Sequence, residues 1–299
     1  MNTKARILVN GDMQISGELI EGAGVNFSED GVSSNEFIEG NITNTNPLSM
    51  KDGKVIIKGE LEEGFSFSSA TQSNSVIQDG LLLDYNFRGK SNLDVLRTVV
   101  QDSSVNGFDG ALNNFSFNTS SGYGEALLFD GIDDTVTSVG NISMDSYIAS
   151  SYEIYVKPKS FNVKDGGVYG AAISNLTHSS NPRKGISIAP NKNGIYIEYS
   201  NNGTLKDLVI PATGIDLNVW SHIVITYDGV TMKAYLNSKL IWHGLIQFIQ
   251  NNQKIIIGRW ALDYSQYFYS GEIASIKVYN KALSEKEILQ NYEVETGGY

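Results

Sequence analysis

A predicted hairpin at residues 220–237 constrains the fold of this chain more than any other segment. It reads WSHIVITYDGVTMKAYLN, and in its first half every second residue, from Ile223 to Tyr227, is bulky and apolar. Such alternation places two sets of side chains on opposite faces of a sheet. Asp228-Gly229 follows as a hairpin signal, because glycine adopts a positive φ without steric cost. Two strands alone are marginal in water, so the flanking segments must supply further strands.

Short strand-like segments separated by turn residues fill the chain from Gly80 onward. They are residues 80–89, 125–139, 151–158, 170–175, 185–190, 194–201, 239–246, 254–260 and 271–280. Many short strands at this spacing predict a β-sandwich or jelly roll. One helix is predicted at 284–292, where Ser284 and Glu287 form a capping box. We therefore predict an all-β protein, an antiparallel jelly-roll β-sandwich with one short C-terminal helix, preceded by a small β-repeat region.

Three related segments precede this region, at residues 10–22, 30–40 and 52–64. Each combines Asn-Gly or Asp-Gly, a short strand-like run and a closing Glu-Gly, which suggests a repeated turn-and-strand unit. Their apolar content is thin for an independent core, so we predict that residues 1–64 dock onto a partner or oligomerise. The alternative is a flexible, half-ordered arm. Residues 65–79 are Ser-rich and are predicted to be a linker, and the jelly roll is assigned to 80–299.

Composition argues against several classes of function. The chain has no cysteine, which rules out disulfides, thiol nucleophiles and cysteine-based zinc sites. Its formal net charge is −11, which does not favour binding to nucleic acid or to an anionic membrane surface. No apolar run approaches transmembrane length, so no membrane insertion is expected. Residues 1–13 lack the apolar run of a signal peptide, and we expect synthesis in a cytoplasm without export by that route.

The acidic residues do not form the pattern that glycoside hydrolysis needs. That chemistry requires two carboxylates facing one cleft with separated pKa values. Glu153 stands alone in its strand, Glu272 has no acidic residue two positions on, and Glu285 and Glu287 belong to the predicted helix. There is also no G-x-S-x-G elbow for a serine nucleophile. We predict that the protein is not an enzyme and requires no cofactor.

The DGIDD turn brings three carboxylates together at Asp130, Asp133 and Asp134. Calcium is bound by several oxygen ligands, and a loop can supply carboxylates and carbonyls at once. One interpretation is therefore a structural calcium site. The other is a simple β-turn at Asp130-Gly131 followed by solvated acids.

The most aromatic stretch is residues 259–271, RWALDYSQYFYSG. Sugars are held by aromatic rings against their apolar faces and by planar polar groups at their hydroxyls. The candidate ligand-binding residues are Trp260, Tyr264, Tyr267, Asp263 and Arg259, with Trp242 on a neighbouring strand extending the same surface. The alternative is that these rings pack the edge of the sandwich.

Residues 80–295 resemble the laminin G-like, concanavalin A-like jelly-roll lectin family. The motifs that carry the resemblance are, in order, LLLDYNFRG, DSSVNGFDGAL, LLFDGIDDTVTS, YEIYVKP, NVWSHIVITYDGVTMKAYLNSKL and FYSGEIASIKVYNKALSEKEILQNY. The chain departs from the family at Tyr155, where Trp is usual, and at Ala274 and Ser275, where an acidic pair is usual. The resemblance implies a jelly-roll fold, carbohydrate binding and, as in many relatives, one structural calcium.

The N-terminal repeats resemble the attachment regions of bacteriophage tail and fibre proteins. This resemblance implies a homotrimeric virion protein of the tail-fibre or receptor-binding type. It would dock onto other virion proteins through residues 1–64 and bind a host-surface glycan without catalysis. Two alternatives stay open. One is a purely structural virion decoration or fibre protein with no sugar binding, and the other is a glycan-degrading enzyme or its accessory module.

Overall fold

The computed structural model describes residues 75–161 and 170–297 in full, and before them only the backbone of four short strands. The chain forms two compact units, Met1–Ser75 and Val76–Tyr299. In the first unit, β1 (Lys4–Ile7), β2 (Met13–Ser16), β3 (Ser49–Lys51) and β4 (Lys54–Ile56) form an antiparallel sheet in the order β1-β2-β4-β3.

The described strands coincide with only part of the predicted repeats. β2 falls inside the first repeat, 10–22, and β4 inside the third, 52–64. The second repeat at 30–40 and the linker up to residue 74 lie outside the described residues. The docking or oligomerising role of residues 1–64 therefore stays a prediction.

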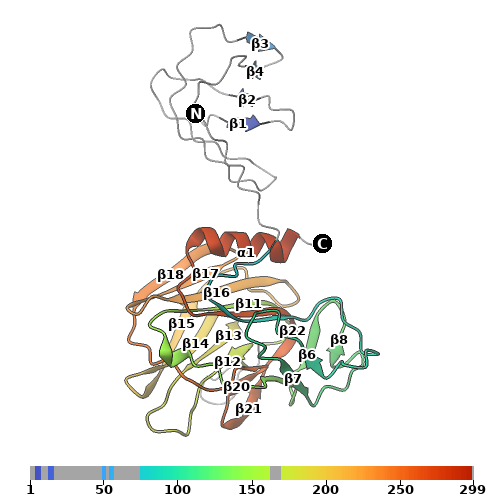
Figure 1. Ribbon diagram of the computed structural model, residues 1–299, viewed down its shortest axis with the longest axis vertical. Helices are drawn as coiled ribbons and strands as arrows, with labels where there is room; N and C mark the ends of the chain where they lie inside the picture. Colours follow the sequence, from blue (N-terminus) through green and yellow to red (C-terminus); the bar gives the residue numbers. More distant parts are fainter. Residues whose placement is uncertain are drawn as a thin grey trace. The chain divides into compact units, whose positions relative to one another are not determined.

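Two antiparallel sheets pack face to face in the second unit (Figure 1). The first, here called the helix-covered sheet, has the order β18-β17-β16-β11-β22-β9-β8, and β5 also pairs with β22. Its strands are β5 (Leu81–Asn86), β8 (Gly122–Tyr123), β9 (Leu127–Asp130), β11 (Ser150–Pro158), β16 (Ser221–Tyr227), β17 (Thr231–Leu236), β18 (Lys239–Leu245) and β22 (Ser270–Tyr279).

The second sheet, here called the hairpin-covered sheet, has the order β15-β14-β13-β12-β19-β10-β7-β6. Its strands are β6 (Val99–Val100), β7 (Gly110–Asn113), β10 (Thr135–Ser138), β12 (Ile173–Ser174), β13 (Ile186–Asn191), β14 (Gly194–Asn201), β15 (Thr204–Pro211) and β19 (Ile256–Ile257). A separate hairpin of β20 (Arg259–Ala261) and β21 (Tyr264–Phe268) and a short 3-10 helix, η1 (Met144–Ser146), complete the strands and turns. The predicted all-β jelly-roll sandwich is confirmed.

The hydrophobic core lies between the two sheets. On β16, Ile223 and Ile225 belong to this core, whereas Val224 between them packs in a second cluster with Ile288 of the C-terminal helix. Both faces of β16 are therefore buried, one by the opposite sheet and one by the helix. The predicted hairpin is confirmed, because β16 pairs with β17 in register and the turn glycine Gly229 has a φ of 103°.

The C-terminal helix α1 (Glu285–Gly297) covers the outer face of the helix-covered sheet (Figure 1). The capping box forms as predicted: the Ser284 N–H donates to the Glu287 carboxylate at 2.8 Å, and the Glu287 N–H donates to the Ser284 hydroxyl at 3.4 Å. The helix ends five residues later than the predicted boundary at 292. Its buried side chains are Ile288, Asn291 and Glu295, so two of the three are polar. Among the described residues, no helix is long and apolar enough to cross a membrane.

Candidate functional site

A cluster of aromatic rings lies on the outer face of the hairpin-covered sheet, under the β20–β21 hairpin. On β14, Ile197 points into the core between the sheets, so the next residue, Glu198, points to the outer face. Trp260 of β20 packs there with Leu176 and Leu205. The hairpin is thus fixed to the sheet by an apolar contact from β20.

Trp260 forms the floor of this cluster. Its side chain is only 3% exposed, and its indole N–H donates a hydrogen bond to the Glu198 carboxylate. The ring centroids of Tyr264 and Tyr267 lie 5.3 and 5.4 Å from that of Trp260, edge to face, and the His178 ring lies at 4.9 Å. Trp260 therefore supports three rings above it and is itself too deep to contact a ligand.

Tyr264 and Tyr267 form the outward surface of the cluster. Both side chains are half-buried, and their rings lie 6.1 Å apart with an angle of 12° between the planes. Tyr267 adopts a φ of 62°, in the left-handed region, although it lies inside a strand. Such a conformation is costly for a bulky residue and persists when surrounding contacts enforce it.

Arg259 and Asp263 bind the backbone of the hairpin and of its neighbouring turn. The Arg259 guanidinium donates to the carbonyls of Ala261 at 3.1 Å and Leu262 at 2.8 Å. The Asp263 carboxylate accepts the N–H groups of His178 at 2.8 Å and Ser179 at 2.7 Å. Partial burial alone raises the pKa of Asp263, but the two N–H donors outweigh it and lower that pKa. Both charged residues therefore position the aromatic rings.

Glu198 is a deeply buried carboxyl on the outer face of its sheet. It is 6% exposed, and burial raises its pKa to about 7. The Trp260 hydrogen bond opposes this rise, and the charge of Asp207, its cross-strand partner on β15, adds to it. Asp207 is exposed and accepts a hydrogen bond from the Tyr196 hydroxyl at 3.0 Å.

The structure does not bring Trp242 to this cluster. Trp242 lies on β18, an edge strand of the helix-covered sheet, and its half-buried ring packs against the core between the sheets. The hairpin β20–β21 lies on the outer face of the other sheet. The expected extension of the aromatic surface by Trp242 is therefore not formed.

Asp130, Asp133 and Asp134 do converge, with one carboxylate oxygen of each within 4.8 Å of the others. Asp134 is fully buried, and its carboxylate accepts the Asp130 N–H at 2.9 Å and the Ser121 hydroxyl at 3.1 Å. Burial raises its pKa to about 6, and the charges of Asp130 and Asp133 add to that effect. Three clustered carboxylates match the oxygen donors that calcium prefers. The residues thus fit a calcium ion in donor type and spacing.

Comparison with known proteins identifies the family to which this fold belongs. A family model described as the concanavalin A-like lectin/glucanases superfamily matches residues 130–289, more than half of the chain. The chain belongs to the concanavalin A-like lectin/glucanase superfamily. No curated protein sequence matches it significantly.

Several solved structures resemble this chain at low sequence identity. Domain 4 of AbnA, an extracellular arabinanase from Geobacillus stearothermophilus in complex with arabinotriose, is 16% identical with a TM-score of 0.52; 71% of this chain and 98% of that chain are covered. The HCR/D mutant structure is 17% identical with a TM-score of 0.51, over 73% and 53% of the two chains. The botulinum neurotoxin serotype D binding domain is 18% identical with a TM-score of 0.49, over 73% and 52%. This chain therefore spans about half the length of the last two.

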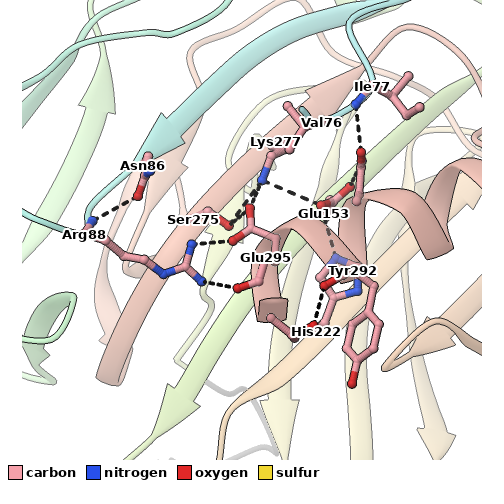
Figure 2. Close-up of polar contacts among 12 residues, drawn as sticks. Val76, Ile77, Asn86, Arg88, Glu153, His222, Ser275, Lys277, Tyr292 and Glu295 are labelled. Carbon is pink, nitrogen blue, oxygen red and sulfur yellow. Dashed lines mark hydrogen bonds and ion pairs between the residues drawn. The ribbon is translucent and has the colours of Figure 1, made fainter. Parts of the chain in front are cut away.

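A second group of polar residues in this concanavalin A-like domain is buried between α1 and the helix-covered sheet (Figure 2). Lys277 of β22 pairs with Glu295 of α1 and lies 3.7 Å from Glu153 of β11. Arg88 also pairs with Glu295, and His222 Nε2 lies 3.1 Å from the Glu153 carboxylate. Burial opposes ionisation of Glu295, but Lys277 and Arg88 outweigh it and lower its pKa to about 2.

This buried group holds the helix rather than forming a reaction site. Glu153, His222, Lys277 and Glu295 are each at most 4% exposed, so a substrate has no access to them in this structure. Buried charges are stable only when paired and hydrogen-bonded, and each carboxylate here meets that condition.

Sequence reasoning missed His178 and Glu198 as parts of the aromatic cluster. His178 lies in a loop that Asp263 holds against the hairpin, and Glu198 lies on β14 beneath Trp260. Both contacts join residues more than 60 positions apart in the chain. The alternation along 194–201 does place Glu198 on the face opposite Ile197, and that pattern was the available signal.

Proposed function

We propose that this concanavalin A-like domain binds carbohydrate, without turnover, on the aromatic surface formed by Tyr264, Tyr267 and His178. The observation that carries the proposal is the pair of half-buried tyrosine rings, 6.1 Å apart, supported edge to face by the buried Trp260. Aromatic rings of this kind meet the apolar faces of sugars, and phenolic hydroxyls at their edge meet sugar hydroxyls. Rings that are already packed lose little conformational entropy on binding.

Two further features support a preformed binding surface. Asp263 fixes the loop of His178 through two backbone hydrogen bonds, and Arg259 fixes the turn of the hairpin through two others. The solved arabinanase domain with this fold was determined with arabinotriose bound. The present chain shares its fold at 16% identity, so the glycan itself has to be identified by experiment.

In the wider proposal the protein is a bacteriophage attachment protein of the tail-fibre type, located in the virion. Residues 1–64 would join it to other virion proteins and to two further copies of itself. A homotrimer would present three weak glycan sites together, and simultaneous engagement of a host surface raises avidity without any new contact. The sequence repeats at 10–22, 30–40 and 52–64 support this arrangement.

The experiment is a glycan-array screen with the full chain, followed by titration of the best hit. Tyr264→Ala and Tyr267→Ala should each weaken binding about 2- to 10-fold, since a well-placed aromatic contact is worth about 0.5–1.5 kcal/mol. Tyr147→Ala is the control, because Tyr147 is an exposed tyrosine (38%) directly after η1, outside this cluster. Equal binding by all variants would overturn the proposed site.

Two other results would replace the proposal. No binding to any glycan favours a purely structural virion component. Release of reducing sugar from a bound glycan indicates an enzyme, and Glu198 with Asp207 would then be the carboxylate pair to test first, because they are cross-strand partners.

A further inference from the structure

A short segment leads into the second compact unit and lies against α1, outside the core between the sheets. It comprises residues 76–80, is here called the entry segment, and follows directly on the first unit. Val76 and Ile77 pack in the apolar cluster that contains Ile288 of α1. The Ile77 N–H also donates to the Asn291 side-chain oxygen of α1 at 2.8 Å (Figure 2). The helix therefore binds the segment by which the chain enters the domain.

A second contact joins the entry segment to the start of α1. Lys281, in the turn before the helix, forms ion pairs with the carboxylates of Asp79 and Glu287. The Asp79 side chain is exposed, so its pair with Lys281 is worth little by itself. Next to it, the Asn280 N–H donates to the Gly80 carbonyl at 2.9 Å. Both ends of the entry segment are thus held by α1 or by the turn before it.

The helix α1 is itself held mainly by polar and charged contacts. Of its three buried side chains, Asn291 and Glu295 are polar and only Ile288 is apolar. Asn291 donates to the Glu153 carboxylate at 2.6 Å. Glu295 forms a buried ion pair with Lys277. Among the described residues, none of α1 belongs to the core cluster between the sheets, so the helix can leave without opening that core.

The face of the sheet under α1 is charged. Glu153 of β11 and Lys277 of β22 are direct cross-strand partners, and each is only 1% exposed with the helix in place. Taking charges out of water is costly, and a buried ion pair often returns no net stability. Undocking of α1 gives these charges back to water, so it costs less than exposing an apolar face of the same area.

His222 leaves a polar atom without a partner under the helix. The side chain is fully buried, and its ring lies 5.5 Å from that of Tyr292 of α1. Nε2 lies 3.1 Å from the Glu153 carboxylate, whereas Nδ1 has no hydrogen-bond partner among the described residues. A buried polar atom without a partner costs free energy, and water would satisfy it once the helix lifts. The docked state therefore carries a cost that the undocked state does not.

We propose that α1 is a releasable strap coupled to the entry segment. While the helix is docked, residues 76–80 are held; when either element is released, the other is released too, and the sandwich stays folded. Such local opening below the global unfolding free energy is common in proteins. A partner that binds the first unit and displaces the entry segment would thereby uncover the charged face under α1. The coupling is reciprocal, as linkage requires. The inference does not rest on the domain binding carbohydrate.

The test is hydrogen–deuterium exchange of the full chain, read at single amides. The Ile77 amide and the amides of residues 288–295 should exchange at similar rates, at least ~10-fold faster than the amides in the centre of β11. Equal protection of α1 and β11 would overturn the proposal, because the helix would then open only with the whole domain. Independent rates for Ile77 and α1 would overturn the coupling.

Two variants act on one element and are read on the other. Glu295→Gln removes a buried charge that contacts no residue of the entry segment, so the Ile77 amide should exchange at least ~10-fold faster only through α1. Ile77→Pro removes the N–H that binds Asn291, so α1 should exchange about 3- to 10-fold faster. In both variants the β11 amides should stay the slowest.

The control and a milder variant complete the design. Lys286→Ala, at an exposed lysine of α1, should change neither exchange rate. Asn291→Ala leaves the Glu295 ion pairs in place and should speed exchange of α1 and of Ile77 by the same factor. An unchanged Ile77 amide in Glu295→Gln contradicts the proposal, as does an unchanged α1 in Ile77→Pro.

Discussion

The indole N–H of Trp260 donates a hydrogen bond to the carboxylate of Glu198, and this bond joins the β20–β21 hairpin to the outer face of β14. Both side chains are buried there, at 3% and 6% exposure. The aromatic surface of Tyr264 and Tyr267 thus rests on a tryptophan whose only polar atom is satisfied by a titratable group. The charge state of Glu198 is therefore expected to affect how firmly the hairpin is held.

Glu198 should make stability depend on pH. Burial raises its folded-state pKa from 4.5 to about 7, so the folded state binds the proton more tightly than the unfolded state. Stability from this group is present below pH 4.5 and is lost as pH rises through about 7, by roughly 3 kcal/mol at most. Urea unfolding of the unchanged protein and of Glu198→Gln, repeated at several pH values between 4.5 and about 7, measures this loss of unfolding free energy. The variant should lose this part of the dependence, and parallel curves for the two proteins would contradict the assignment.

Lys277 should be among the most sensitive positions in the sandwich. Lys277→Met leaves the carboxylates of Glu153 and Glu295 buried without their shared cation. Removing one partner of a buried charge group costs about 3–5 kcal/mol. Denaturant unfolding measures the loss, with Lys206→Met as the control because Lys206 is exposed on β15. If Lys277→Met lowers the unfolding free energy no more than Lys206→Met does, the carboxylates of Glu153 and Glu295 must be in contact with water.

Calcium should stabilise the domain if the Asp130, Asp133 and Asp134 cluster holds it. Addition of millimolar calcium should raise the thermal midpoint of the full chain, because a ligand that binds only the folded state stabilises it. Asp133→Asn should remove most of the calcium effect, and Asp133 is the appropriate change because it is exposed, whereas Asp134 is buried and hydrogen-bonded. Magnesium serves as the control ion. If calcium leaves the thermal midpoint unchanged, the segment is a simple β-turn at Asp130-Gly131 and not a calcium site.

The oligomeric state tests the role of residues 1–64. Light-scattering mass on the full chain and on residues 76–299 compares the protein with and without its first compact unit. A trimeric full chain and a monomeric truncation are expected if the repeats form an assembly stem. If both the full chain and the truncation are monomers, residues 1–64 do not assemble the protein in solution. The protein would then be a single lectin-like domain, or a subunit that orders only on a virion partner.

Local patterns made several parts of this protein predictable from its sequence. The β16–β17 hairpin follows from alternation around Asp228-Gly229, and the start of α1 follows from the capping box at Ser284. These depend on residues within a few positions of each other. The family was predictable too, because the matching family model covers residues 130–289, within the range 80–295 that the motifs indicated.

The sites depend on contacts between strands that are distant in the chain, and no local pattern reports them. Glu295 lies beyond the predicted end of the helix at 292, yet α1 extends past it and places it against Lys277 of β22. The aromatic stretch at 259–271 indicated a ligand surface. In the structure Trp260 is buried against Glu198 of β14, and Tyr264 and Tyr267 lie above it with His178. Alternation determines which residues share a face of a strand. The packing of the two sheets and of α1 then decides which element covers each face and which charged side chains become buried.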